Sequence, residues 1–167
     1  MLTVGDYFPE FNMQAVDEDN ALTSIEILLP EWTVVYFYPK DFTFICPTEI
    51  ADMDMLSTYV DVIGVSGDNE YCHLAWKEQN PMIRNIEHIL ASDSGLVLSN
   101  KLGIVSHKDG VCFRATYIID PEGIIQHVSI NALDTGRNAE EVLRTVQALQ
   151  AGGLTGCSWQ PGDDFVA

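Results

Sequence analysis

The stretch Thr33–Glu49, which reads Thr-Val-Val-Tyr-Phe-Tyr-Pro-Lys-Asp-Phe-Thr-Phe-Ile-Cys-Pro-Thr-Glu, decides the fold. Its opening run of β-branched and aromatic residues predicts a buried strand. After a loop, Cys46 comes at the start of a predicted helix, where Pro47 suits the first turn because its missing N–H costs nothing there. Unpaired N–H groups and the helix dipole favour negative charge at this end, so a thiol placed there most easily becomes a thiolate.

The spacing of Pro39, Thr43 and Cys46 carries a family resemblance. Pro-x-x-x-Thr-x-x-Cys is similar to the active-site signature of the peroxiredoxins. The longer string Asp41–Ile50 resembles the two-cysteine subgroup of that family, which includes bacterial alkyl hydroperoxide reductase C. The short pattern alone is weak evidence, whereas ten consecutive matching positions after a strand are specific. Further matches are Gly64-Val-Ser66, His73-Leu-Ala-Trp76, Arg114-Ala-Thr-Tyr-Ile-Ile-Asp120, Gly136-Arg137, Cys157-Ser-Trp159 and Pro161-Gly162.

Length and composition indicate one globular domain, since the chain has 167 residues, of which 47% are hydrophobic and 20% charged. The net charge of −17, from 25 acidic and 8 basic residues, disfavours nucleic acid and anionic membrane surfaces as partners. No run approaches the length of a membrane span. The first residues show neither a basic nor an apolar leader region, so we expect a cytoplasmic protein.

Four cysteines stand far apart in the sequence: Cys46, Cys72, Cys112 and Cys157. Because none forms a Cys-x-x-Cys pair, neither a zinc ribbon nor a thioredoxin-type dithiol motif is expected. The four histidines show no metal-ligand spacing, and no nucleotide or haem motif occurs. The cysteines therefore predict mostly reduced thiols, with one or two of them functional.

Alternating strand and helix patterns predict an α/β fold, and the resemblance implies a thioredoxin-like fold with a central mixed sheet flanked by helices. We expect residues 1–153 to form the peroxidase domain and residues 154–167 a C-terminal tail that carries Cys157. Residues 3–12 are expected to be a loop with a short extended piece. The expected strands are 33–38, 60–66, 89–91, 112–119 and 124–130, and the expected helices are 48–59, 70–79, 96–102 and 138–150.

Cys46 is the expected nucleophile. A lone cysteine is more often buried and inert, but the helix start and the flanking threonine and proline favour catalysis here. Its thiolate would attack a peroxide oxygen and become a sulfenic acid. Thr43 would offer a hydroxyl to the hydroperoxide or to the thiolate, although such a group is otherwise a simple loop or cap hydroxyl. Pro39 would hold the loop and shield the thiolate from water.

Arg114 lies among apolar neighbours on a predicted strand, where an arginine needs an anion. A thiolate beside it would be stabilised, and the guanidinium could polarise the peroxide O–O bond. The alternative is an ordinary salt bridge at a strand edge. The resemblance implies that Arg114 is the active-site arginine, and that Glu49 and Arg137 position it.

Cys157 is the candidate resolving cysteine, which would attack the sulfenic acid and close a disulfide. In the family the resolving cysteine usually stands four residues before the tryptophan, whereas Cys157 stands two before Trp159. Two alternatives stay open at this point. Cys112, which is two residues from Arg114, is a second candidate resolver, and an external thiol could replace a resolving cysteine altogether.

The residues and the resemblance together predict a peroxiredoxin that reduces hydrogen peroxide and small organic hydroperoxides without a metal or an organic cofactor. The resemblance implies a homodimer, in which Cys46 of one chain faces Cys157 of the other; decamers of five such dimers also occur in the family. It implies a dithiol reductant protein, either thioredoxin-like or a dedicated disulfide reductase.

Other functions on the same fold are a one-cysteine peroxidase and a redox-regulated holdase chaperone. The intact signature argues against loss of the chemistry, and the missing Cys-x-x-Cys disfavours a thioredoxin-like disulfide reductase. Peroxide-dependent oxidation of a dithiol donor would separate these functions.

Overall fold

The computed structural model describes residues 1–26 and 31–167. It contains two compact units, Met1–Arg137 and Asn138–Ala167, which are described separately below. The domain boundary expected between residues 153 and 154 stays a prediction. Within the described residues, no helix is both long and apolar enough to cross a membrane.

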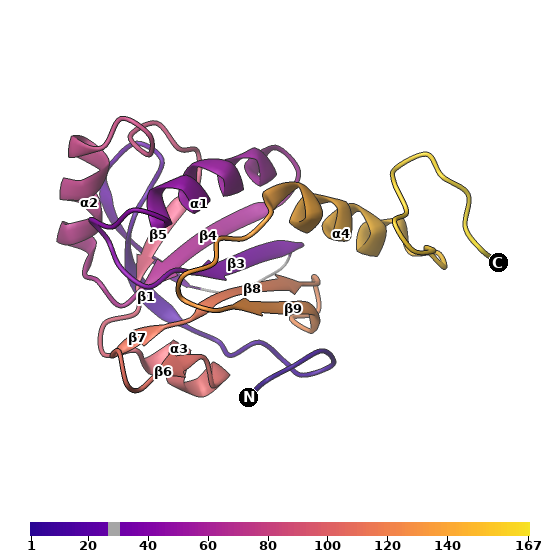
Figure 1. Cartoon of the computed structure of the whole chain (residues 1–167), viewed down its shortest axis with the longest axis horizontal. Helices are drawn as coiled ribbons and strands as arrows, with labels where there is room; N and C mark the ends of the chain where they lie inside the picture. Colours follow the sequence, from indigo (N-terminus) through magenta and orange to yellow (C-terminus); the bar gives the residue numbers. More distant parts are fainter. Residues whose placement is uncertain (27–30) are drawn as a thin grey trace. The chain divides into compact units, whose positions relative to one another are not determined.

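The described residues form strands, α-helices and one 3₁₀-helix, drawn in Figure 1. The strands are β1 Asn12–Val16, β2 Leu22–Glu26, β3 Thr33–Phe37, β4 Asp61–Ser66, β5 Ile89–Ser92, β6 Val105–Ser106, β7 Val111–Cys112, β8 Arg114–Ile119 and β9 Ile125–Asn131. The helices are α1 Cys46–Met53, the 3₁₀-helix η1 Asp54–Thr58, α2 Glu70–Gln79, α3 Val97–Leu102 and α4 Ala139–Ala151.

A seven-stranded mixed sheet in the order β2-β1-β5-β4-β3-β8-β9 forms the first unit. β3 and β5 each pair in parallel with β4, whereas β8 runs antiparallel to both β3 and β9. In Figure 1, α1 and α2 lie on one side of this sheet and α3 lies on the other. This arrangement confirms the expected α/β class with a central mixed sheet flanked by helices.

Strand β3 lies inside the sheet and leads into the segment that carries Cys46. All five of its residues are buried, as expected for a strand with both faces covered. Val35 and Phe37 belong to the core cluster that includes residues of α3. On the opposite face, Tyr38 packs against Trp76 of α2, with ring centroids 6.2 Å apart. The side chains therefore alternate along this segment, with Phe37 in the core cluster and Tyr38 on the face that packs against α2.

Most expected elements are present, with three differences. β1 and β2 form an antiparallel hairpin over residues that were not expected to pair. The expected strand 112–119 is divided at Phe113, because Val111–Cys112 pairs with β6 while Arg114–Ile119 joins the main sheet. The expected helix 48–59 begins earlier, at Cys46, and narrows to a 3₁₀-helix from Asp54.

Gly64 of β4 makes room for Tyr36 on the neighbouring strand. A Cβ added at Gly64 would lie 2.5 Å from the Tyr36 hydroxyl oxygen and 2.9 Å from a methyl carbon of Leu90. We expect Gly64→Ala to lower the free energy of unfolding by about 1–3 kcal/mol, since the buried ring has to shift. Urea denaturation measures the change. Gly136→Ala is the matched control, since its Cβ would make only ordinary contacts, the nearest at 3.5 Å from Ile45. Equal stability of the two variants would contradict the prediction.

The C-terminal unit consists of α4 and the segment that follows it. Asn138 caps the helix, since its side-chain oxygen accepts a hydrogen bond from the Glu141 backbone N–H at 3.1 Å. Gly152 ends the helix in the left-handed conformation, at φ 71°. Beyond Gly152 the chain forms turns with no regular element.

Candidate active site

Cys46 is the first residue of α1, and its side chain is buried, with 1% of the residue exposed. Pro47 follows in the first turn, as expected. The backbone N–H groups of Thr48 and Glu49 both bond the Ile45 carbonyl, at 3.0 and 3.2 Å. The thiol therefore lies at the N-terminal end of a helix, where the helix dipole favours an anion.

Arg114, the first residue of β8, brings a guanidinium to this sulfur. Its Nη1 donates to Cys46 Sγ at 3.3 Å and to Glu49 Oε2 at 2.6 Å, and its Nε donates to the Leu133 carbonyl at 2.8 Å. Burial acts to lower the pKa of Arg114, but the hydrogen bond to Cys46 and the charge of Glu49 outweigh it and raise that pKa. Arg114 therefore stays positively charged beside the sulfur.

Glu49 lies between two arginines. One of its oxygens accepts from Arg114, and the other accepts from Arg137 Nε at 3.0 Å. Arg137 also donates to the Phe37 carbonyl at 2.6 Å, and its guanidinium lies 5.1 Å from the centre of the Tyr36 ring. Glu49 and both arginine side chains are at most 5% exposed. Two positive charges thus face one carboxylate in this buried cluster, so an anion beside Arg114 would balance the second positive charge.

Thr43 and Pro39 lie on the loop between β3 and α1, and both are half-buried. The Thr43 hydroxyl donates to the Lys40 carbonyl at 2.8 Å and so closes a turn of this loop. The bond is that of a loop hydroxyl, so contact of Thr43 with a peroxide remains a prediction. Between them, Phe42 takes a left-handed conformation with φ 56°, which is rare for a bulky residue.

A buried network that the sequence did not reveal supports the same loop. Asp41 accepts a hydrogen bond from Tyr38 Oη at 2.8 Å and pairs with His73 Nδ1 at 2.6 Å. The other ring nitrogen of His73 lies 3.1 Å from the Ala91 carbonyl oxygen. The sequence offered one sign of this network, which is the acidic Asp41 three residues after Tyr38 at the end of a buried strand. A buried carboxylate requires hydrogen-bonding partners.

The remaining cysteines differ in their surroundings. Cys112 is buried, its thiol donates to the Tyr38 carbonyl at 3.1 Å, and burial raises its pKa to about 12. Cys72 is partly buried, and burial together with the charge of Asp41 raises its pKa to about 12. Cys157 is exposed and lies in the C-terminal unit. All the cysteines are free thiols in this state.

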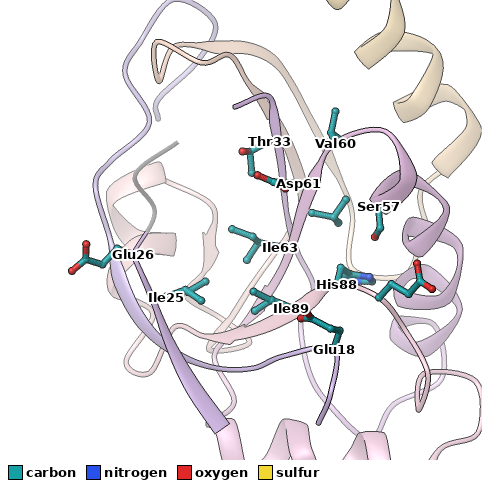
Figure 2. Close-up of a pocket in the computed structure, with 12 residues that line it drawn as sticks. Glu18, Ile25, Glu26, Thr33, Ser57, Val60, Asp61, Ile63, His88 and Ile89 are labelled. Carbon is teal, nitrogen blue, oxygen red and sulfur yellow. The ribbon is translucent and has the colours of Figure 1, made fainter. Parts of the chain in front are cut away.

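A cavity of about 370 Å³ lies elsewhere in the first unit (Figure 2). Ile25, Ile63, Ile89 and His88 are among the residues that line it, and none of its lining residues belongs to the Cys46 cluster. The cavity is linked to that cluster through Tyr36. His88 lies 2.7 Å from the Tyr36 hydroxyl, and the Tyr36 ring lies against Arg137. The described part of the chain contains no group of ligands that could hold a metal ion.

Comparisons with known proteins identify the family that this chain resembles. Residues 4–128 match the AhpC/TSA family. The chain is 37% identical to alkyl hydroperoxide reductase C of Mycolicibacterium smegmatis, covering 99% of this chain and 94% of that protein. It is 39% identical to the putative peroxiredoxin YkuU of Bacillus subtilis, with 95% of each chain covered.

Solved structures of similar proteins extend the comparison to the fold. The reduced 2-Cys peroxiredoxin of Plasmodium vivax superposes with a TM-score of 0.91 at 35% identity, covering 98% of this chain and 92% of that one. Mycobacterium tuberculosis AhpC gives a TM-score of 0.86 at 36% identity, and the match covers 96% of this chain and 99% of that one. These matches confirm the thioredoxin-like fold class expected from the sequence.

Proposed function

We propose that this chain, which belongs to the AhpC/TSA family, reduces hydroperoxides through a sulfenic acid at Cys46. Members of this family are thiol-dependent peroxidases, and so is this chain. The observation that carries this assignment is the hydrogen bond of 3.3 Å from Arg114 Nη1 to Cys46 Sγ. Of the cysteines, Cys46 is the one that combines a helix N-terminus with a charged donor at the sulfur. Both features stabilise the thiolate that attacks peroxides.

In the first step, the Cys46 thiolate attacks one oxygen of the hydroperoxide. A sulfur–oxygen bond forms and the O–O bond breaks, so sulfur gives up two electrons. The leaving oxygen takes up a proton and departs as water from hydrogen peroxide, or as an alcohol from an organic hydroperoxide. The Arg114 guanidinium can stabilise the charge that develops on these oxygens, while Glu49 and Arg137 hold it in place. Because Cys46 is almost fully buried, small hydroperoxides are the substrates that fit best.

In the second step, Cys157 of a second copy attacks the sulfur of the Cys46 sulfenic acid. The S–S bond forms, and the hydroxyl on Cys46 leaves with the thiol proton as water. The exposure of Cys157 supports this role, because it must reach another chain. Cys112 is disfavoured, because its buried thiol has a pKa of about 12 and the attacking species is the thiolate. A dithiol reductant protein then reopens the disulfide of the homodimer or of a decamer built from it.

Cys157→Ser tests this resolution step. We expect the variant to oxidise Cys46 once but to form no disulfide-linked dimer, and turnover with a dithiol protein to fall more than about tenfold. Non-reducing electrophoresis after one equivalent of peroxide, with mass mapping of the cross-linked peptides, measures the result. Cys112→Ser is the control and should keep the dimer. A dimer that persists in Cys157→Ser would show another resolver, and full turnover with a monothiol would show a one-cysteine mechanism.

A further inference from the structure

The C-terminal segment 154–166 closes on itself. The Val166 N–H donates to the Leu154 carbonyl at 2.9 Å, which joins the two ends of the segment. The rings of Trp159 and Phe165 stack with centroids 6.2 Å apart and an interplanar angle of 6°. These contacts make the segment a folded loop within its unit.

Cys157 lies on an exposed turn of this C-terminal loop. The turn is closed by the Trp159 N–H, which donates to the Gly156 carbonyl at 3.3 Å. Within it, Ser158 takes the left-handed conformation with φ 58°, which non-glycine residues seldom adopt. Such a conformation persists only where surrounding contacts hold it. The Gly156–Trp159 turn therefore depends on a support.

Arg144 of α4 provides that support. Its guanidinium is forked onto Glu141 of the same helix, with Nε–Oε2 and Nη2–Oε1 distances of 2.7 and 2.8 Å. Its remaining nitrogen, Nη1, donates to the Trp159 carbonyl at 3.2 Å. Glu141 is bonded by two of the guanidinium nitrogens, and the third nitrogen is bonded to the turn. The side chain thereby ties the turn to the helix.

The same hydrogen bond brings the guanidinium to the turn that carries Cys157, because the Trp159 carbonyl is only two residues further along the chain. The pKa of Arg144 is raised, chiefly by its hydrogen bond to Glu141, and the charge of Cys157 adds to this rise. The guanidinium therefore lies within electrostatic range of the thiol as well as bonded to its turn.

We propose that Arg144 is a positioning residue for Cys157, which holds the Gly156–Trp159 turn and keeps a positive charge beside the thiol. The inference rests on the proposed function, in which Cys157 attacks the Cys46 sulfenic acid. A thiol on a held turn samples fewer unproductive arrangements than one on a loose loop, so its effective concentration at the sulfenic acid is higher. Arg144 thus acts on the second step of the reaction and leaves the first step unchanged.

The first measurement is the rate of each step in Arg144→Gln. Rapid quenching after one equivalent of peroxide should show disulfide formation slowed about tenfold, the loss expected for one charge-assisted hydrogen bond. Trapping of the Cys46 sulfenic acid should show oxidation at the wild-type rate. Arg84→Gln is the matched control, because it removes the same charge from an exposed arginine that donates to the Glu78 carbonyl. It should leave both rates unchanged.

The second measurement separates the charge of Arg144 from a merely structural role. In the Cys46→Ser background, Cys157 is alkylated with iodoacetate, which is anionic, and with iodoacetamide, which is neutral. The rate with iodoacetate divided by the rate with iodoacetamide should be about threefold lower in Arg144→Gln than in the variant that keeps Arg144. In Arg144→Lys this ratio should be retained. Loosening of the loop alone would change both rates together and leave the ratio unchanged.

The outcomes distinguish this inference from the proposed function. If Cys157→Ser still forms the dimer, Cys157 is not the resolver and the proposed second step fails. If Cys157→Ser forms none but Arg144→Gln resolves within about twofold of wild type, the inference alone is overturned. Slowed resolution with an unchanged alkylation ratio overturns the charge part of the inference, because Arg144 would then act on Cys157 only by holding the turn.

Discussion

Cys46→Ser is expected to abolish peroxide turnover, lowering kcat/KM by at least about 10³-fold. A serine hydroxyl at this position stays protonated and its oxygen cannot donate two electrons to the peroxide, whereas a thiolate can. The Arg114 N–H would still find an acceptor there, so the variant should fold and bind normally. Peroxide consumption coupled to a recycling dithiol, together with rapid mixing for a single turnover, measures the loss.

Cys72→Ser is the matched control for this substitution. It makes the same change at a cysteine whose pKa is raised to about 12, so its turnover should stay within about twofold of wild type. Turnover that survives in Cys46→Ser would contradict the assignment of the nucleophile. Loss of turnover in both variants would instead point to damage that is unrelated to the reacting sulfur.

Arg114→Lys is expected to lower kcat/KM by about 10²-fold although the charge is kept. The guanidinium reaches Cys46 Sγ and Glu49 from one nitrogen and the Leu133 carbonyl from another. A lysine ammonium is a compact group that cannot span these acceptors. Stopped-flow measurement of Cys46 oxidation by hydrogen peroxide isolates the affected step.

The control for Arg114→Lys separates chemistry from folding. A urea-unfolding midpoint near that of wild type would show that the slow oxidation is not caused by partial unfolding. Added guanidinium ion should restore part of the rate to Arg114→Ala, because it can occupy the space beside Glu49. An oxidation rate in Arg114→Lys within about threefold of wild type would contradict the role.

Local signals in the sequence predicted the elements that depend on neighbouring residues. Glu70–Gln79 has the predicted bounds because Asn69 caps it and Pro81 follows its end. The β1–β2 hairpin was missed because β2 alternates between exposed and half-buried positions and carries few strongly apolar residues. The hairpin joins the main sheet through pairing of β1 with β5, a strand distant in sequence, which local patterns do not report.

In the candidate site, too, contacts between residues distant in sequence could not be predicted from local patterns. The resemblance identified Cys46, Arg114, Glu49 and Arg137, and the structure brings these four together in the first unit. It could not indicate that Tyr36 lies under Arg137, since the two residues are far apart in the sequence. The role of Cys157 remains a proposal, because resolution requires a second chain.

The raised pKa of Cys72 and Cys112 has a consequence for how electrons pass through the molecule. Because burial raises the pKa of each thiol to about 12, both sulfurs stay protonated at neutral pH. A sulfur that is almost never ionised exchanges slowly with disulfides and sulfenic acids. In the proposed cycle, an oxidising equivalent that enters at Cys46 would therefore not pass to Cys72 or Cys112. The proposed route from Cys46 to Cys157 would then carry the pair of electrons transferred in each cycle.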